Sequence, residues 1–149
     1  MQVREIMNTR LKTATADDLI KDISTLMCLN KISGVPVVED GDRLIGVLSE
    51  KDILHCVFPD AHELFLNGER PNYERMEKEF RNVLNRKVGE LMTKVVSTVS
   101  PEMPVMKAAS MMWLKKIRRI PVVEEERLVG IVSIGDVHRA LFQQHLVND

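Results

Sequence analysis

The chain lacks any long apolar run. None of its hydrophobic stretches approaches the roughly 20 residues that a membrane-spanning helix needs, and its first ten residues, MQVREIMNTR, have no signal-peptide core. Its 149 residues are 44% hydrophobic and 29% charged, a composition typical of globular proteins that stay in solution. We therefore expect a cytoplasmic protein of one ordinary domain or two very small ones, with no membrane partner.

Cysteine is also scarce, and the charges nearly cancel. The two cysteines, Cys28 and Cys56, have no spacing typical of a metal or redox site, which fits a reducing cytoplasm. Cys28 lies beside Leu26, Met27 and Leu29, and this apolar setting predicts a buried, inert thiol. A net charge of −1 at pH 7 gives no support for nucleic acid as a partner.

The sequence further lacks the residue groups that catalysis requires. Enzymes need an activated nucleophile, a metal cluster or paired carboxylates. The four histidines follow no recognisable spacing, and the adjacent His62 and Glu63 do not by themselves form a metal-ligand pattern. We predict that the protein is not an enzyme, with no catalytic residue, no metal and no required cofactor.

What the chain does contain is an internal repeat. Residues 35–52 read VPVVEDGDRLIGVLSEKD and residues 120–136 read IPVVEEERLVGIVSIGD, while residues 3–15 match residues 88–100. A unit of about 55 residues has little surface to bury when it folds alone. We therefore expect two copies that share a core and form related clefts where they meet.

The repeat divides the chain into three parts: repeat 1 over residues 1–58, a helical insertion or linker over residues 59–85, and repeat 2 over residues 86–149. Within the insertion, Asn67 and Gly68 mark a break. We expect the helix that follows to pack on its own domain or on a second subunit, because it has one apolar face. That face consists of Tyr73, Met76, Phe80, Val83 and Leu84.

Each repeat predicts the element order β-α-β-β-α, which is an α/β (α+β) fold. An extended piece rich in β-branched residues comes first, and a helix with apolar residues at helical spacing follows it. Pro101 and Pro104 suit the first turn of that helix in repeat 2. Two apolar strands come next, and a last helix starts at Ser49 or Ser133. The predicted ranges are 13–15 and 97–99 for the extended pieces, 17–30 and 104–115 for the helices, and 35–38, 44–48, 120–123 and 128–132 for the strands.

One motif in each repeat carries chemistry: Gly-h-h-Ser-x-x-Asp, with h apolar, at residues 46–52 and 130–136. It places a serine where strand becomes helix and an aspartate in the first helical turn. A helix N-terminus attracts phosphate, the serine can donate to a phosphate oxygen, and the aspartate can accept from two ribose hydroxyls. A pocket lined by Val35 or Ile120 could hold a flat base. The same serine and aspartate also form a helix cap that needs no ligand, and the two roles are compatible.

A basic run, Lys115 to Arg119, immediately precedes the second Ile-Pro-Val-Val strand. Residues 86–149 carry ten basic and seven acidic side chains, and this run supplies much of the excess. The run is either a solvated helix end or an anion-binding site.

The doubled pattern h-P-V-V, acidic turn, h-h-G-h-h-S-x-x-D resembles the cystathionine-β-synthase (CBS) domain pair, or Bateman module. The resemblance covers the chain except the insertion. It implies a pseudo-twofold pair of β-α-β-β-α units with two clefts that bind an adenosine-containing ligand, namely AMP, ADP, ATP or S-adenosylmethionine. It also implies a homodimer that regulates an enzyme, channel or transporter, here an unidentified effector protein.

The resemblance also assigns roles to residues. The aspartates of the two motifs would hold ribose hydroxyls, and the serines would reach the phosphate. Lys51 would add a phosphate contact, which Gly135 cannot supply in repeat 2. Arg118 and Arg119 match a basic pair that faces the phosphates in the regulatory γ subunits of the AMP-activated protein kinase; Ser33-Gly34 replaces that pair in repeat 1, so the two clefts should differ. The predicted ligand-binding residues are Val35, Ser49, Lys51, Asp52, Arg118, Arg119, Ile120, Pro121, Ser133 and Asp136.

Two functions therefore remain open from the sequence. The first is a regulatory module for signal transduction that senses an adenine nucleotide. The second is a ligand-free scaffold for dimerisation or interaction, in which the motifs only cap helices and the insertion supplies the partner surface. A homodimer would use helical faces that include Leu141, Phe142 and Leu146, extended by the helix at 72–85.

Overall fold

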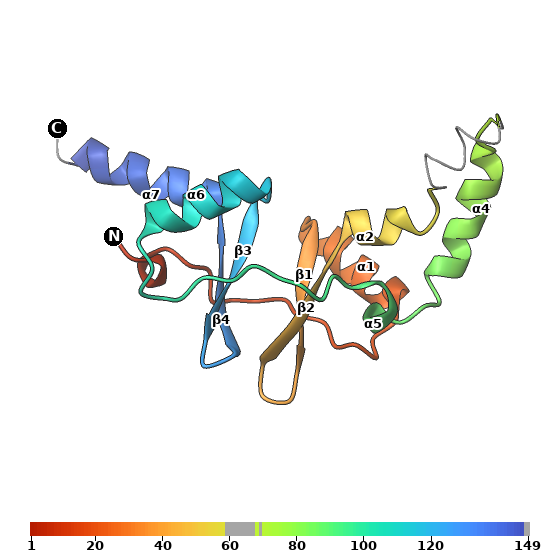
Figure 1. Cartoon of the computed structure of the whole chain (residues 1–149), viewed down its shortest axis with the longest axis horizontal. Helices are drawn as coiled ribbons and strands as arrows, with labels where there is room; N and C mark the ends of the chain where they lie inside the picture. Colours follow the sequence, from red (N-terminus) through yellow and green to blue (C-terminus); the bar gives the residue numbers. More distant parts are fainter. Residues whose placement is uncertain (59–67, 69, 148–149) are drawn as a thin grey trace. The chain divides into compact units, whose positions relative to one another are not determined.

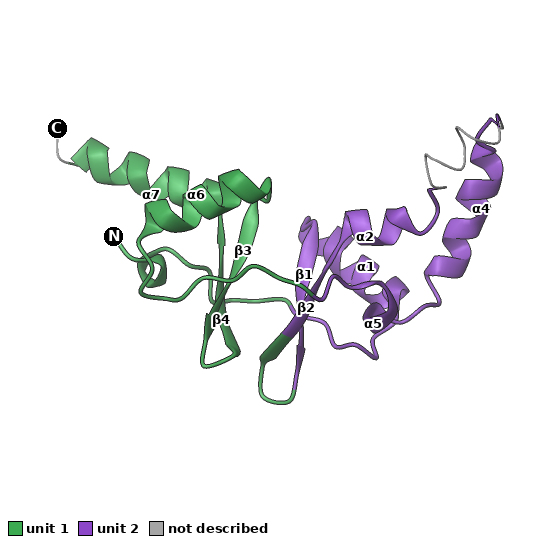
Figure 2. Cartoon of the chain, viewed as in Figure 1, with its two compact units in different colours: residues 1–12, 40–44, 95–149 green, residues 13–39, 45–94 purple. Residues whose placement is uncertain are grey.

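The computed structural model describes residues 1–58, 68 and 70–147, so His62, Glu63 and Asn67 of the insertion lie outside the described residues. The chain forms two compact units (Figure 2). Unit 1 comprises Met1–Lys12, Asp40–Leu44 and Val95–Asp149, and unit 2 comprises Thr13–Glu39 and Ile45–Lys94.

The two units do not coincide with the two sequence repeats, because each contains the opening segment of the other repeat. In unit 1, the Val3 amide donates to the Met103 carbonyl over 2.9 Å, just before the first helix of repeat 2. In unit 2, the Val88 amide donates to the Asp18 carbonyl over 2.8 Å, just before the first helix of repeat 1. These backbone bonds, rather than sequence order, decide which segment completes which unit.

Unit 2 carries the helices and strands of repeat 1 and the insertion helix (Figure 1). Its elements are α1 (Ile20–Asn30), β1 (Gly34–Glu39), β2 (Arg43–Ser49, which begins in unit 1), α2 (Glu50–His55), α4 (Tyr73–Val83) and α5 (Val88–Leu91). Helix α1 buries Ile20, Ile23 and Met27, which share one face at helical spacing. Cys28 lies off that face and is exposed, so the prediction of a buried thiol was wrong.

Unit 1 carries the helices and strands of repeat 2 together with the N-terminal segment. Its elements are the 3-10 turn η1 (Val3–Glu5), α6 (Val105–Lys115), β3 (Arg119–Glu124), β4 (Arg127–Ser133) and α7 (Ile134–Val147). The core of this unit gathers Val3 from the N-terminal segment with residues of α6, β3, β4 and α7. Among its largest fully buried side chains are Met112, Ile120, Val122 and Val132.

The strands confirm the predicted order. β3 and β4 are antiparallel, with Arg119 opposite Ser133 at one end and Glu124 opposite Arg127 at the other. The extended pieces pair in parallel with the first strand of their own repeat, as Ala14 with Val37 and Val99 with Val122. Within unit 1, Arg43 at the start of β2 pairs antiparallel with Arg127 of β4.

Both first helices begin later than the sequence predicted, α1 at Ile20 rather than residue 17 and α6 at Val105. Before α1, the Asp18 carboxylate accepts the Thr15 amide over 2.8 Å and holds a separate turn. Before α6, Pro104 occupies the N-cap with extended backbone (ψ 135°), so it precedes the first helical turn rather than lying in it.

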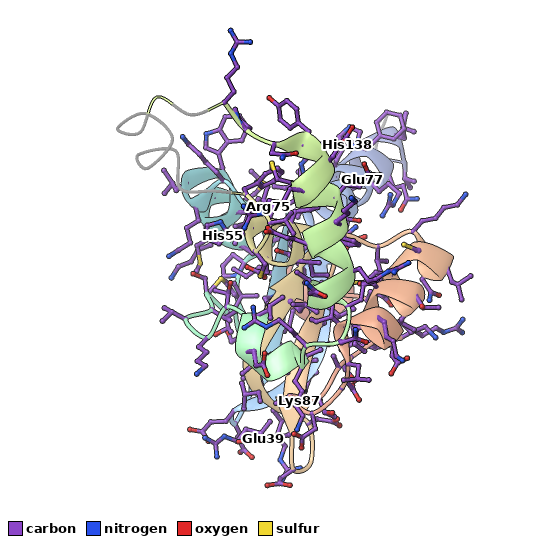
Figure 3. All side chains as sticks on the ribbon, turned by 90° about the vertical axis from the view of Figure 1, so that its right-hand side faces the viewer. Glu39, His55, Arg75, Glu77, Lys87 and His138 are labelled. Atoms are coloured by element: carbon purple, nitrogen blue, oxygen red, sulfur yellow. The ribbon has the colours of Figure 1, made fainter. Side chains whose placement is uncertain are left out.

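The insertion helix packs on its own unit. Asn72 caps α4 by accepting the Arg75 amide over 3.0 Å, and Arg75, labelled in Figure 3, pairs with Glu79 on the same helix. Phe80, Val83 and Leu84 pack against the core of unit 2. Of the other residues of the predicted apolar face, Met76 is half-buried and Tyr73 is 72% exposed. Among the described residues, no helix has the length and apolar character needed to cross a bilayer.

Candidate functional site

The motif of unit 2 forms a reciprocal cap at the start of α2. The Ser49 amide donates to Asp52 Oδ2 over 2.8 Å, and the Asp52 amide donates to Ser49 Oγ over 3.2 Å. The Ser49 hydroxyl also contacts Asp52 Oδ2, at 3.0 Å. The cap therefore fixes Oδ2 of the Asp52 carboxylate and leaves Oδ1 to a different partner.

Thr93 is a neighbour of this motif that the sequence analysis did not predict. Its hydroxyl donates to Asp52 Oδ1 over 3.0 Å. Its backbone pairs with Val47 of β2 through two bonds of 2.9 and 3.0 Å, which hold the Met92-Thr93 segment beside the motif. The repeat alignment contained the signal, since the matched Met7 and Met92 are each followed by a polar residue, Asn8 and Thr93.

The motif of unit 1 repeats the cap with a different outer partner. The Ser133 amide donates to Asp136 Oδ2 over 2.9 Å, and the Asp136 amide donates to Ser133 Oγ over 3.0 Å. Asp136 Oδ1 accepts from Arg139 Nη2 at 2.7 Å. Asn8 takes the place of Thr93, and its backbone pairs with Ile131 over 2.8 and 3.0 Å. The two aspartates are thus held alike by their caps but paired differently at Oδ1.

The glycine of each motif gives space to the segment that crosses it. A Cβ on Gly46 would lie 2.8 Å from the Thr93 carbonyl oxygen and 2.9 Å from Met92 Sδ. A Cβ on Gly130 would lie 2.7 Å from Met7 Sδ. Because real Cβ atoms do not approach a backbone oxygen so closely, Gly46 is required for packing rather than for a turn, whereas a side chain at position 130 would have to displace the Met7 side chain.

The structure places the predicted basic pair beside the unit 1 motif. Arg119 is the Cα partner of Ser133 across the β3–β4 ladder. The Arg118 carbonyl accepts the Ile134 amide over 2.9 Å, which ties it to the start of α7. Both arginine side chains are exposed. The backbone of Arg118 and Arg119 therefore lies beside Ser133 and the start of α7, at one end of unit 1.

The corresponding end of unit 2 has little room for such a pair. Ser33 and Gly34 stand there, and a Cβ on Gly34 would lie 3.0 Å from the Leu48 carbonyl oxygen and 3.5 Å from the Ser49 Cα. Lys51 is exposed on the first turn of α2. The cation nearest to the unit 2 motif in the sequence is therefore Lys51 on α2, and not a residue at the start of β1.

The residues predicted to wall a base are buried. Val35 is 1% exposed within the core of unit 2, and Ile120 is 0% exposed within the core of unit 1. Pro121 is buried as well. Any surface that these positions offer to a ligand is consequently backbone rather than side chain. Over the residues that the structure describes, there is also no group of three or more His, Cys, Asp or Glu side chains placed to hold a metal ion.

Comparison with known proteins identifies the architecture. The family model of the CBS domain matches twice, over residues 3–58 and 88–143. The chain belongs to the CBS domain family. The two CBS matches contain both Gly-h-h-Ser-x-x-Asp motifs and leave the α4 helix between them, so the predicted tandem CBS pair is confirmed.

Relatives of this CBS pair match along nearly its whole length. An uncharacterised protein of Methanocaldococcus jannaschii, MJ1426, is 33% identical over 95% of this chain and 91% of its own. The mitochondrial CBS domain-containing protein CBSX3 of Arabidopsis thaliana is 29% identical over 96% of this chain and 66% of its own. The crystal structure of CBSX2, from the same plant, in complex with AMP is 27% identical, with a TM-score of 0.75 and coverage of 97% and 98%.

Proposed function

We propose that this protein is a regulatory module that binds an adenine nucleotide and signals its presence to a partner protein. The observation that carries the proposal is the cluster in unit 1, where two arginines flank a serine and an aspartate at a helix start. The similarity to CBSX2, crystallised with AMP, supports adenine as the base. CBS-pair proteins are in general regulatory, non-catalytic modules.

The caps leave suitable groups for a nucleotide. Oδ2 of Asp52 and of Asp136 is held by the backbone of the cap, whereas Oδ1 is held by side chains, which a ligand can displace. We assign Oδ1 to the ribose hydroxyls. The hydroxyls of Ser49 and Ser133 and the positive end of each helix would receive phosphate oxygens.

Charged side chains around the motifs would complete the phosphate contacts. Lys51 would serve the unit 2 motif, and Arg118 and Arg119 stand at the unit 1 motif. We propose that the backbone at Val35 and at Ile120-Pro121, near the starts of β1 and β3, would contact the base. These assignments make phosphate recognition chiefly a matter of arginine and lysine side chains, which form strong charge-assisted bonds to phosphate.

Ligand binding is tested by thermal unfolding. Because a ligand that binds only the folded state stabilises it by RT ln(1 + [L]/Kd), AMP at a hundredfold excess over Kd should add about 2.7 kcal/mol. For a chain of this size that corresponds to a rise in melting temperature of roughly 5–10 °C. The Asp52→Asn/Asp136→Asn variant keeps an acceptor oxygen for each cap but loses both charges, and should show a much smaller rise.

The ligand-free scaffold is the competing function, and one observation favours it. The serine and aspartate of each motif already bond each other as a helix cap within the chain. If AMP, ADP, ATP and S-adenosylmethionine at millimolar concentration all leave the melting temperature unchanged, the scaffold function is correct and the nucleotide proposal is wrong.

We also propose that the protein forms a homodimer through helices of unit 1. Helices α6 and α7 pack against each other, and both carry exposed apolar side chains: Trp113 is 81% exposed, Phe142 57% and Leu146 60%. Leu141, predicted for the same surface, instead packs against the core of unit 1. Large exposed apolar groups on adjacent helices are typical of an association surface.

Sedimentation velocity at tens of micromolar protein should give twice the chain mass of 17.0 kDa. Phe142→Glu should shift the protein toward the monomer, because a charge at an apolar contact is desolvated without a partner. Gln143→Glu adds the same charge at the adjacent exposed position and is the matched control. A pure monomer in the wild type would rule out this dimer.

A further inference from the structure

The unit 1 motif lacks a counterpart of Lys51 in its sequence, but in the structure Arg139 supplies a cation at the same place. Lys51 precedes Asp52 in repeat 1, whereas Gly135 precedes Asp136 in repeat 2. In the structure, a Cβ on Gly135 would lie 3.8 Å from Arg139 Nη1 and 3.6 Å from Ser133 Oγ. The Arg139 guanidinium therefore reaches back over the first turn of α7, to the place that a side chain at position 135 would occupy.

The formal charges at this end of unit 1 favour an anion. Arg118, Arg119 and Arg139 contribute positive charges near the start of α7, and Asp136 contributes a negative one. Helix α7 runs from Ile134 to Val147, and its N-terminal dipole adds to the positive potential. A phosphate would be attracted to this end of the unit.

We propose that Arg139 is a phosphate-binding residue that discriminates nucleotide from nucleoside at the unit 1 motif; this inference rests on the proposed nucleotide-binding function. Without ligand, its guanidinium pairs with Asp136 Oδ1 at 2.7 Å. When a nucleotide binds, the ribose hydroxyls take over Asp136 Oδ1 and the guanidinium bonds the phosphate. Charge is conserved in this exchange, since each ion leaves one partner for another.

Because the Arg139–Asp136 ion pair is near solvent, breaking it when a nucleotide binds should cost little free energy. The Arg139 side chain is 65% exposed and that of Asp136 is 22% exposed, and ion pairs near water are weak. A guanidinium binds phosphate through two parallel bonds, which are stronger than a single exposed contact to a carboxylate. Adenosine would displace Arg139 from Asp136 without offering it a phosphate, so the wild type should prefer AMP.

Unit 2 pairs its aspartate in a different way. Asp52 Oδ1 accepts the neutral hydroxyl of Thr93 at 3.0 Å, and the residue three positions after Asp52 is His55, which Figure 3 labels on α2. Displacing a threonine hydroxyl releases no cation toward the ligand. The exchange that we propose is therefore a property of the unit 1 motif.

The test is calorimetric titration of AMP and of adenosine into full-length protein, with every variant carrying Asp52→Asn so that the unit 1 motif is followed. Arg139→Gln should weaken AMP about tenfold, the loss of one good charge-assisted contact, and leave adenosine unchanged or slightly tighter. Arg139→Lys should retain part of the AMP affinity because it keeps the charge. Arg127→Gln removes a guanidinium at the far end of β4, where it bonds the Gly41 carbonyl, and should change neither ligand.

Adding Gly135→Lys to the Arg139→Gln variant is a rescue experiment. It places a lysine where repeat 1 has Lys51, and the site accepts a side chain because a Cβ on Gly135 makes only ordinary contacts. AMP affinity should recover at least in part. Recovery would show that the position needs a cation rather than the Arg139 side chain as a structural support.

The other outcomes separate the two proposals. If the Asp52→Asn protein binds AMP but Arg139→Gln loses nothing, Arg139 is not a phosphate ligand and the nucleotide function stands. An equal loss for AMP and adenosine would show that Arg139 only orients Asp136, which also overturns the inference. If the wild type binds no adenine ligand, the proposed function is wrong and the inference falls with it.

Discussion

Replacing Arg118 and Arg119 together by alanine should weaken AMP binding strongly and leave adenosine binding almost unchanged. Each of these two guanidinium groups, at the start of β3 and just before it, can form a charge-assisted bond to phosphate, worth about 1.5–3 kcal/mol. The loss should be about ten- to a hundredfold in affinity for each arginine that contacts the ligand. Adenosine has no phosphate to lose, so the ratio of the two affinities, measured by calorimetry, is the informative quantity.

Two further variants make this result specific. Lys12→Ala/Lys107→Ala removes the same charge from exposed positions of the same unit outside the basic run and should lower AMP affinity only through the weaker long-range field, which salt screens. Asp136→Ala should weaken AMP and adenosine alike, because both carry the ribose. An AMP affinity that survives in the arginine variant would show that the basic run is a solvated helix end.

Replacing Gly46 by valine should destabilise unit 2 by about 3 kcal/mol, a cost typical of forcing bulk into a packed site. The Cβ alone would lie 2.8 Å from the Thr93 carbonyl oxygen, a backbone atom that is paired with Val47 and cannot turn away. For a chain of this length the melting temperature should fall by roughly 10 °C. Thr93 would move as well, and its bond to Asp52 would be lost.

Substitutions at the two other glycines of the motifs, Gly130 and Gly135, should cost less stability than Gly46→Val. Gly130→Val meets Met7 side-chain atoms, of which Sδ is nearest at 2.7 Å, and a flexible side chain can yield more than a backbone carbonyl. Its cost should therefore be smaller than that of Gly46→Val. Gly135→Ala makes only ordinary contacts at 3.6 and 3.8 Å and should leave the melting temperature nearly unchanged. Equal losses for Gly46→Val and Gly135→Ala would contradict this account.

Local patterns predicted the local structure well. The alternation of strands and amphipathic helices gave the observed order, and Ser49 and Ser133 begin α2 and α7 as caps because their side chains bond backbone groups only three residues away. The prediction for Cys28 was wrong because its apolar neighbours in the sequence do not show which face of the helix is buried. Cys28 has apolar neighbours in sequence, but the face of α1 that packs is set by Ile20, Ile23 and Met27.

The same distinction applies to the candidate site: some of its residues could be predicted from neighbouring sequence, and others could not. The serine and aspartate of each motif and the position of Arg118-Arg119 beside Ser133 follow from adjacent elements of one repeat. Thr93 could not be predicted with the same reasoning, because it reaches Asp52 from 41 residues away. Arg139 lies only three residues after Asp136, a spacing at which helical side chains pair, so its signal was local although the sequence analysis did not use it.

The sequence alone therefore determined that the chain is a doubled β-α-β-β-α unit with a capped Ser-x-x-Asp motif in each copy, because propensity, periodicity and capping act over a few residues. Only the tertiary structure decided that each opening segment completes the unit of the other repeat, Met7-Asn8 at Gly130 and Met92-Thr93 at Gly46. The opening segments resemble each other and carry no periodic signal of a partner. Backbone hydrogen bonds and burial between residues far apart in the chain select their places, and these become visible only when the chain is folded.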